Sequence, residues 1–152
     1  MTTWGHWMEG GPVEGESGRT SPLFNPATGE ETGVVTLASS SEVQRVLESA
    51  RRAFLTWRES SLTQRTRVLF AFREVVARRL DELALVITDQ HGKVFSDARG
   101  EVQRGLEVVE YACSIPSLLK GEYSDQVSGG VDAFSYRQPL GVVVGITPFN
   151  FP

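Results

Sequence analysis

The sequence of 152 residues predicts an α/β fold, and two observations lead to this prediction. Between residues 39 and 115, apolar side chains recur every three or four positions, which is typical of helices with one buried face. Residues 140–146 instead form a continuous apolar run, as parallel strands covered on both faces do. Because no earlier segment offers such a strand a partner, we expect the chain to be the front part of a larger α/β protein.

Composition favours a globular protein and argues against several classes of partner. Hydrophobic residues make up 40% of the chain, which is enough to bury a core, and the formal charge is -4. Without a basic patch, we expect neither nucleic acid nor a membrane surface as a partner. No apolar run reaches the roughly eighteen residues that span a bilayer, and no signal peptide is recognisable. The single Cys113 cannot form an intrachain disulfide, so we expect a reducing, cytoplasmic setting.

The first elements are expected to be a leader, a turn and a strand. Residues 1–21 contain five glycines and few aliphatic side chains, so we predict a flexible leader with an irregular backbone. Residues 24–30 place Asn-Pro and Gly at turn positions. The β-branched residues of 32–36 follow directly and predict a short strand.

Three helices are expected next. Ser39 and Glu42 have the spacing of a capping box, so a helix should begin here and bury an apolar stripe that reaches Trp57 in the core. A second helix should begin near Thr63 and run into a third. Gly92 should end the third helix, because glycine readily adopts the left-handed conformation found at helix C-termini.

A fourth helix and a hairpin complete the pattern. Apolar residues keep a helical period from about Ser96 to Ile115, and Pro116 is expected to stop this helix. Residues 122–126 and 131–138 resemble strands joined through Ser128-Gly129-Gly130, which predicts a hairpin with one solvated side.

Few side chains in this sequence point to chemistry. Asn150 follows the apolar run of 140–146, where open α/β sheets place their ligands, and its carboxamide could donate an N–H to a developing oxyanion. The alternative is that Asn150 simply belongs to a turn. Arg104 could bind a carboxylate in a bidentate manner, or it could pair with Glu101 or Glu107 on the same helix.

Cys113 does not fit a nucleophile. It lies on the apolar stripe of the fourth helix with no histidine near it in sequence, so we expect a buried, structural thiol. No cluster of His and Cys has the spacing of a metal site, and no glycine-rich phosphate loop can be assembled.

Several motifs resemble the front part of an aldehyde dehydrogenase, and the match covers nearly the whole chain after the leader. A second set closely resembles the CoA-acylating branch of methylmalonate-semialdehyde dehydrogenases. The first set is Phe24–Glu30, Ala53-Phe54 with Trp57, His91-Gly92-Lys93 and Arg137–Pro152, and the second is Arg104–Glu110 with Cys113 and Leu119–Gln126.

The resemblance implies a domain organisation. Residues 22–120 would form the N-terminal part of a Rossmann-like NAD-binding domain, mostly helical, and 140–152 would return to it as its first buried strand. Residues 121–139 would be a β-hairpin oligomerisation arm that extends a neighbouring subunit's sheet, in a homo-oligomer that is a tetramer in the parent protein.

The resemblance also implies roles for individual residues. Asn150 would contribute the oxyanion hole, Thr147, Pro148 and Phe149 would line the NAD site, and Arg104 would hold the carboxylate of malonate or methylmalonate semialdehyde. In this family a cysteine thiolate attacks the aldehyde, hydride passes to NAD, and the thioester is transferred to CoA with loss of CO2, without a metal.

The family's nucleophilic cysteine would lie beyond residue 152, so we expect the isolated chain to be inactive. Two alternatives stay open: another kind of aldehyde dehydrogenase, and a non-enzymatic helical module that associates with itself.

Overall fold

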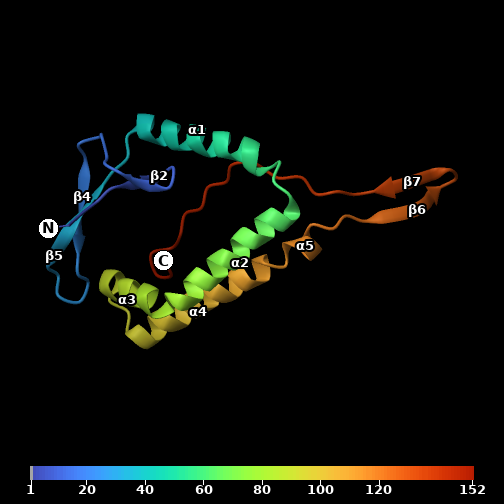
Figure 1. Ribbon diagram of the computed structural model, residues 1–152. Coiled ribbons are helices and arrows are strands. Elements are labelled where there is room, and N and C mark those ends of the chain that lie inside the picture. The colour runs from blue at the N-terminus through green and yellow to red at the C-terminus, as the bar shows by residue number, and fades with distance from the viewer. Residues whose placement is uncertain (1) are drawn as a thin grey trace.

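The computed structural model describes residues 2–152, which form a small N-terminal sheet, a layer of helices and a projecting hairpin (Figure 1). Within these residues, no helix combines the length and the apolar composition needed to cross a membrane. The elements are β1 (Thr2–Trp4), β2 (His6–Met8), β3 (Gly11–Val13), β4 (Thr20–Phe24), β5 (Glu31–Thr36), α1 (Ser40–Trp57), α2 (Leu62–Arg78), α3 (Leu80–His91), α4 (Phe95–Ala112), α5 (Ile115–Leu118), β6 (Tyr123–Ser128) and β7 (Val131–Phe134).

The N-terminal segment is built of strands, so the prediction of an irregular leader over 1–21 is wrong. β5 pairs in parallel with β1 and antiparallel with β4, while β2 and β3 form a separate hairpin. The glycines that suggested flexibility serve turns and close approach instead. Gly10 has a φ of 83° in the β2–β3 turn, and a Cβ on Gly5 would lie 2.6 Å from the carbonyl oxygen of Val13.

The predicted turn and strand that follow are confirmed. The amide of Gly29 donates to the carbonyl oxygen of Asn25 at 2.8 Å, and the side-chain oxygen of Asn25 accepts from the amide of Ala27 at 2.8 Å. This turn leads directly into β5. An Asx-type hydrogen bond of this kind is the physical reason that Asn-Pro sequences favour turns.

The boundaries of the first three helices follow local capping signals. The capping box of α1 is present: the amide of Ser39 donates to Glu42 Oε2 at 2.7 Å, and the amide of Glu42 donates to Ser39 Oγ at 3.2 Å. A second box, between Ser61 and Gln64, begins α2. Gly92 ends α3 with a φ of 78°, as predicted.

The fourth helix is shorter than expected. α4 ends at Ala112, and Cys113 takes the C-cap position. Pro116 then lies in the first turn of the separate helix α5, where its missing N–H costs no hydrogen bond. Pro116 therefore begins a new helix after a break and is not the residue that stops α4.

The buried core is small and lies among the later helices. α3 and α2 both pack against α4, and Figure 1 shows α2 and α4 running alongside one another, with α1 on the other side of the molecule. The apolar side chains that are buried are Leu80, Ala84, Ala98, Leu106 and Cys113.

The prediction that the apolar stripe of α1 lies in the core is wrong within these residues. Val43 is 47% exposed and Trp57 is 48% exposed. The C-terminal part of the stripe faces an open cavity of about 320 Å³ whose other wall is residues 141–143. The stripe is amphipathic as predicted, but the described residues contain no layer that covers it.

Residues 140–146 do not form the predicted buried strand. Leu140 is 96% exposed and Ile146 is 94% exposed, and the segment runs back from the hairpin as an irregular trace (Figure 1). A parallel strand is stabilised by a ladder to its neighbours and by helices on both faces. Residues 2–152 supply no strand that pairs with it, so the apolar run lacks the partners its composition requires.

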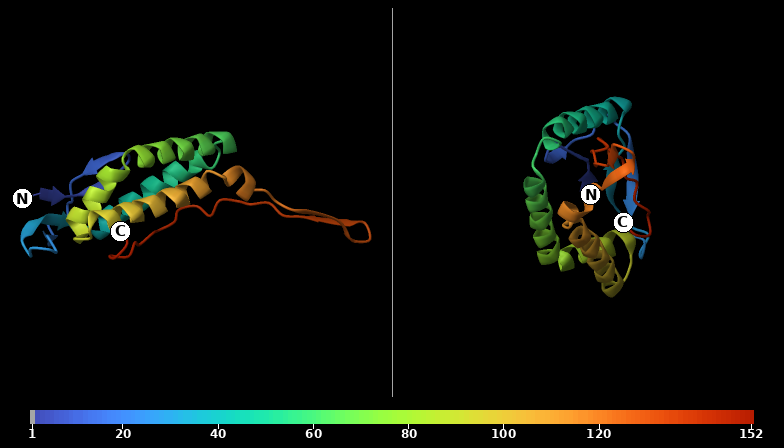
Figure 2. Two further views of the ribbon diagram at one scale, coloured as in Figure 1. Left: turned by 90° about the horizontal axis from the view of Figure 1, so that it is seen from below. Right: turned by 90° about the vertical axis from the view of Figure 1, so that its right-hand side faces the viewer.

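The predicted hairpin is present and projects away from the helices (Figure 2). β6 and β7 pair antiparallel, with Tyr123 opposite Phe134, and Gly130 takes a φ of 77° in the turn. Every residue of both strands is exposed, so both sides are solvated here instead of one. The Tyr123 hydroxyl donates to Asp132 Oδ2 at 2.7 Å, and this hydrogen bond raises the pKa of Tyr123.

Candidate functional site

Four of the five site residues suggested by the sequence lie in or beside the C-terminal turn, and Arg104 lies on α4. The amide of Phe151 approaches the carbonyl oxygen of Pro148 at 3.4 Å, which closes a turn around Phe149 and Asn150. The side chain of Asn150 is exposed, and no hydrogen bond within residues 2–152 engages its carboxamide. The carboxamide is therefore available to a ligand.

A lysine holds this turn against the helices. Lys93 Nζ donates to the backbone oxygen of Asn150 at 3.1 Å and lies 4.5 Å from the centre of the Phe151 ring. The same ammonium forms an ion pair with Glu101, and both side chains of the pair are only 13% exposed. Lys93 directly follows the left-handed Gly92 that ends α3, and Glu101 lies on the second turn of α4.

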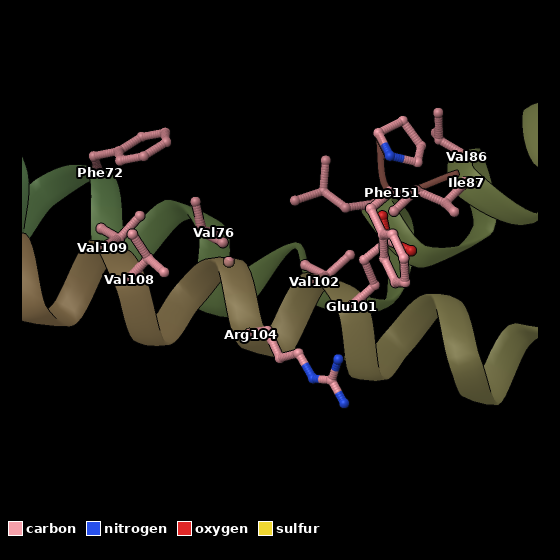
Figure 3. Close-up of a pocket in the computed structure, with 13 residues that line it drawn as sticks. Phe72, Val76, Val86, Ile87, Glu101, Val102, Arg104, Val108, Val109 and Phe151 are labelled. Carbon is pink, nitrogen blue, oxygen red and sulfur yellow. The ribbon is translucent and has the colours of Figure 1, made fainter. Parts of the chain in front are cut away.

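Arg104 lies one turn after Glu101 on α4, and its guanidinium is exposed. Neither of the pairings that the sequence left open is formed, because Glu101 binds Lys93 and Arg104 has no ion pair among the described residues. Figure 3 shows the Arg104 side chain pointing away from the apolar groove that its helix helps to line. An exposed, unpaired guanidinium is suited to binding a carboxylate.

Two adjoining cavities join Arg104 to the C-terminal turn. An apolar groove of about 680 Å³ lies between α2, α3, α4 and the last two residues (Figure 3). A more polar cavity of about 360 Å³ lies beside it against Lys93 and the first turns of α4. Glu101, Arg104 and Phe151 line both cavities. The structure therefore brings Arg104 and the turn that carries Asn150 into one region.

The three residues expected to line an NAD site do not enclose one by themselves. Thr147, Pro148 and Phe149 are all exposed, and Phe149 is 91% exposed. They line neither of the two cavities beside Arg104. A dinucleotide needs walls on more than one side, and these residues can provide at most one of them. No group of three or more His, Cys, Asp or Glu side chains in residues 2–152 is arranged as metal ligands would be.

Cys113 is buried at the end of α4, with 7% of its surface exposed. Its backbone amide donates to the carbonyl oxygen of Val109 at 3.0 Å as the C-cap of the helix. The expectation of a buried thiol is confirmed. A thiol buried in this way is out of reach of a substrate, so this position does not suit a nucleophile.

The strongest electrostatic feature lies far from this site, at the start of α1. The Glu42 carboxylate is 4% exposed and accepts from the amides of Ser39 and Glu16, each at 2.7 Å. These backbone hydrogen bonds lower its pKa to about 2. His6 Nε2 approaches the same carboxylate at 3.5 Å, so Glu42 joins the N-terminal strands to the first helix.

Sequence reasoning did not single out Lys93 or Glu101 as site residues. They are eight positions apart across the α3–α4 loop, so neither helical nor strand periodicity places them together. The one available signal was the left-handed turn predicted at Gly92, which redirects the chain just before Lys93.

Comparison with known proteins gives a consistent result. A model of the "Aldehyde dehydrogenase family" matches residues 13–152. The malonate-semialdehyde dehydrogenase of Pseudomonas aeruginosa is 44% identical over 147 residues, which is 97% of this chain and 30% of that protein. An Arabidopsis thaliana protein named methylmalonate-semialdehyde dehydrogenase [acylating], mitochondrial, is 44% identical over 92% of this chain and 23% of its own length.

Solved structures of proteins with similar names have the same fold over this chain. A methylmalonate-semialdehyde dehydrogenase structure from Sinorhizobium meliloti, complexed with NAD, superposes with a TM-score of 0.94 at 43% identity over 100% of this chain and 31% of that one. The corresponding enzyme from Oceanimonas doudoroffii gives 0.93 at 49% identity, over 99% of this chain and 31% of that one. The chain thus spans about 30% of the length of the curated relatives it matches.

Proposed function

This chain belongs to the aldehyde dehydrogenase family, and we propose that the protein containing it is a CoA-acylating dehydrogenase of malonate or methylmalonate semialdehyde. The observation that carries the proposal is the 44% identity, over nearly the whole chain, to relatives with these names. NAD would accept the hydride, and CoA would accept the acyl group as acetyl- or propionyl-CoA with release of CO2. The NAD-complexed neighbour supports a nicotinamide cofactor.

In this proposal Asn150 donates a hydrogen bond to the oxyanion that forms when the aldehyde carbon is attacked. Its backbone carbonyl is bound by Lys93 while its carboxamide is free, so the residue is anchored on one side and available on the other. A carboxamide N–H needs no proton uptake or release to act as a donor.

Arg104 would bind the carboxylate that distinguishes these semialdehydes from simple aliphatic aldehydes. Its guanidinium is exposed and unpaired, and Arg104 lines the same polar cavity as Phe151 of the turn that carries Asn150. Binding the carboxylate end at Arg104 would leave the aldehyde end to approach Asn150.

Thr147, Pro148 and Phe149 would form one wall of the NAD site, with the other walls supplied by segments outside residues 2–152. The nucleophilic cysteine would come from outside these residues too, because Cys113 is buried. The reaction we propose does not call for a metal. We therefore propose that the 152-residue chain alone does not oxidise aldehydes.

We also propose that 121–139 serves as an oligomerisation arm in a cytoplasmic homo-oligomer. The hairpin projects from the helices with all strand residues exposed, so its edges are open to a neighbouring sheet.

The proposal is tested with a chimera of the Pseudomonas aeruginosa relative in which this chain replaces the matching segment. We call this chimera the exchange protein. Incubated with malonate semialdehyde, CoA and NAD, the exchange protein should form NADH, whereas the isolated chain should form none. NADH formation by the isolated chain, or none by a folded exchange protein, would contradict the proposal.

A further inference from the structure

We propose that Lys93 and Glu101 are positioning residues that hold the Asn150 turn in a fixed place relative to Arg104. The inference deepens the proposed function, on which it rests, and it gives two side chains a role that acts through Asn150.

Residues 139–152 have few other contacts that hold them in place. Residues 139–149 form no strand, and their large side chains are mostly exposed. From residue 139 onward, the only hydrogen bond to the rest of the described chain joins the Asn150 carbonyl to Lys93. The Phe151 ring beneath the same ammonium adds a cation–π contact at 4.5 Å. One side chain therefore makes both polar contacts of the turn.

Lys93 is itself held in place by an ion pair. Its ammonium is paired with Glu101, and each of the two side chains is only 13% exposed. Neither side chain therefore moves freely in solvent. A lysine has three donors and a flexible stem, so an unpaired lysine would not define a position. The Glu101 carboxylate fixes the ammonium on one side, and the Asn150 oxygen and Phe151 ring occupy the others.

Helix α4 connects the two ends of the proposed substrate site. Glu101 lies one turn before Arg104 on α4, so the carboxylate that fixes Lys93 and the guanidinium that would bind substrate share one rigid element. The path from Arg104 through Glu101 and Lys93 to Asn150 consists of a helix turn, an ion pair and a hydrogen bond. Pairing with Lys93 also keeps the Glu101 charge from competing for Arg104.

The chain offers a direct spectroscopic test because Lys93 and Lys120 are its only lysines. In the 152-residue chain labelled with 13C,15N-lysine, the Lys93 ε-methylene signal should lie upfield of the Lys120 signal, since the Phe151 ring lies beneath it. Phe151→Leu should move the Lys93 signal to the Lys120 position, and Lys120→Met assigns the pair and serves as the control. Coincident lysine signals in the unmodified chain would overturn the contact.

The positioning role has its own readout. The heteronuclear NOE of the Asn150 amide should resemble that of α4 and fall to the value of a flexible end in the double variant Lys93→Met/Glu101→Gln. That variant leaves no uncompensated buried charge, so the fold should persist. An unchanged Asn150 NOE in this variant would overturn the positioning role.

The kinetic test uses the exchange protein. The double variant Lys93→Met/Glu101→Gln should lower kcat by roughly ten- to a hundredfold, as a misplaced catalytic group does, while KM stays within about threefold. Lys93→Arg, which keeps the charge and the donor, should restore most of the rate, and Lys120→Met should change nothing. If Asn150→Ala lowers kcat but the double variant Lys93→Met/Glu101→Gln does not, the positioning role fails while the proposed function stands. If the unmodified exchange protein is inactive, the proposed function fails, and the two NMR readouts still decide whether Lys93 holds the turn.

Discussion

At the scale of single residues, the proposed reaction depends on one free carboxamide and one free guanidinium. Asn150 and Arg104 are both exposed and unpaired among residues 2–152, whereas Lys93 and Glu101 are paired with each other. Exposed polar side chains that have no structural partner can be changed without loss of packing. Their variants therefore report on chemistry more than on folding.

Asn150→Ala in the exchange protein should lower kcat for semialdehyde oxidation by roughly a hundredfold, the usual cost of losing one oxyanion donor. Asn150→Asp should lower it at least as much, because a carboxylate of the same shape offers no N–H. Steady-state NADH formation measures both, with circular dichroism as a control for folding. A rate for either variant within a factor of about two of the unmodified protein would remove Asn150 from the mechanism.

Arg104→Leu should lower kcat/KM for malonate semialdehyde by about tenfold to a hundredfold, the size expected for a charge-assisted hydrogen bond. The value for propionaldehyde, which has no carboxylate, should change far less. Arg99→Leu is the matched control, since Arg99 lies on the same helix and is paired with Asp81 at 2.8 Å. Equal losses for both aldehydes in Arg104→Leu would exclude a role in binding the carboxylate.

At the scale of elements, the start of α1 and the end of α3 could be predicted because their signals are local. The Ser39–Glu42 box and the left-handed Gly92 act within a few residues, and both are present. Two predictions that depended on distant packing partners are wrong. The stripe of α1 and the run of 140–146 have the composition of buried elements, but burial requires a second layer that residues 2–152 do not contain.

In the candidate site, too, local features could be predicted and a long-range contact could not. Asn150 and Arg104 could be found from their residue type and from the motifs around them. The pairing of Glu101 with Lys93 instead of Arg104 could not, because it depends on where the α3–α4 loop places the lysine. The strands in 1–21 were missed because their glycines look like flexibility in sequence but serve turns and close backbone contacts.

The capping of α1 predicts a pH dependence of stability. The pKa of Glu42 in the folded chain is about 2, against an ordinary value of 4.5. A lowered pKa means that the ionised carboxylate stabilises the fold above its ordinary pKa and that this contribution is lost as the pH falls toward the folded-state value. The melting temperature of Glu42→Gln should therefore lie below that of the unmodified chain near neutral pH, and the gap should close between pH 4.5 and about 2.

Thermal melts followed by circular dichroism at several pH values would measure this gap. Glu48→Gln is the control, because Glu48 is exposed on the same helix and should give a small gap at every pH. A gap for Glu42→Gln that stays constant or widens as the pH falls would contradict the role of the Glu42 carboxylate.

At the scale of the whole molecule, the chain exposes more apolar surface than a small monomer usually does. The apolar side of α1 and the run of 140–146 are both uncovered, and the strand edges of the hairpin are open. Exposed apolar patches and unpaired edges favour association. Both features fit a chain that spans about 30% of the length of its relatives.

The isolated chain should therefore elute from size exclusion with light scattering as a species heavier than its monomer mass of 16.7 kDa. Val143→Lys and Val144→Lys together should shift it toward the monomer, because Val143 is 74% exposed and Val144 78% exposed in the uncovered run. A stable monomer of the unmodified chain would argue against a self-associating surface.

We propose that this segment belongs to an enzyme that transfers an acyl group to CoA. The most direct test is mass spectrometry of the products that the exchange protein forms from methylmalonate semialdehyde and NAD, with and without CoA. Propionyl-CoA should be the main product when CoA is present. A free carboxylic acid as the sole product, at a rate that does not depend on CoA, would contradict it.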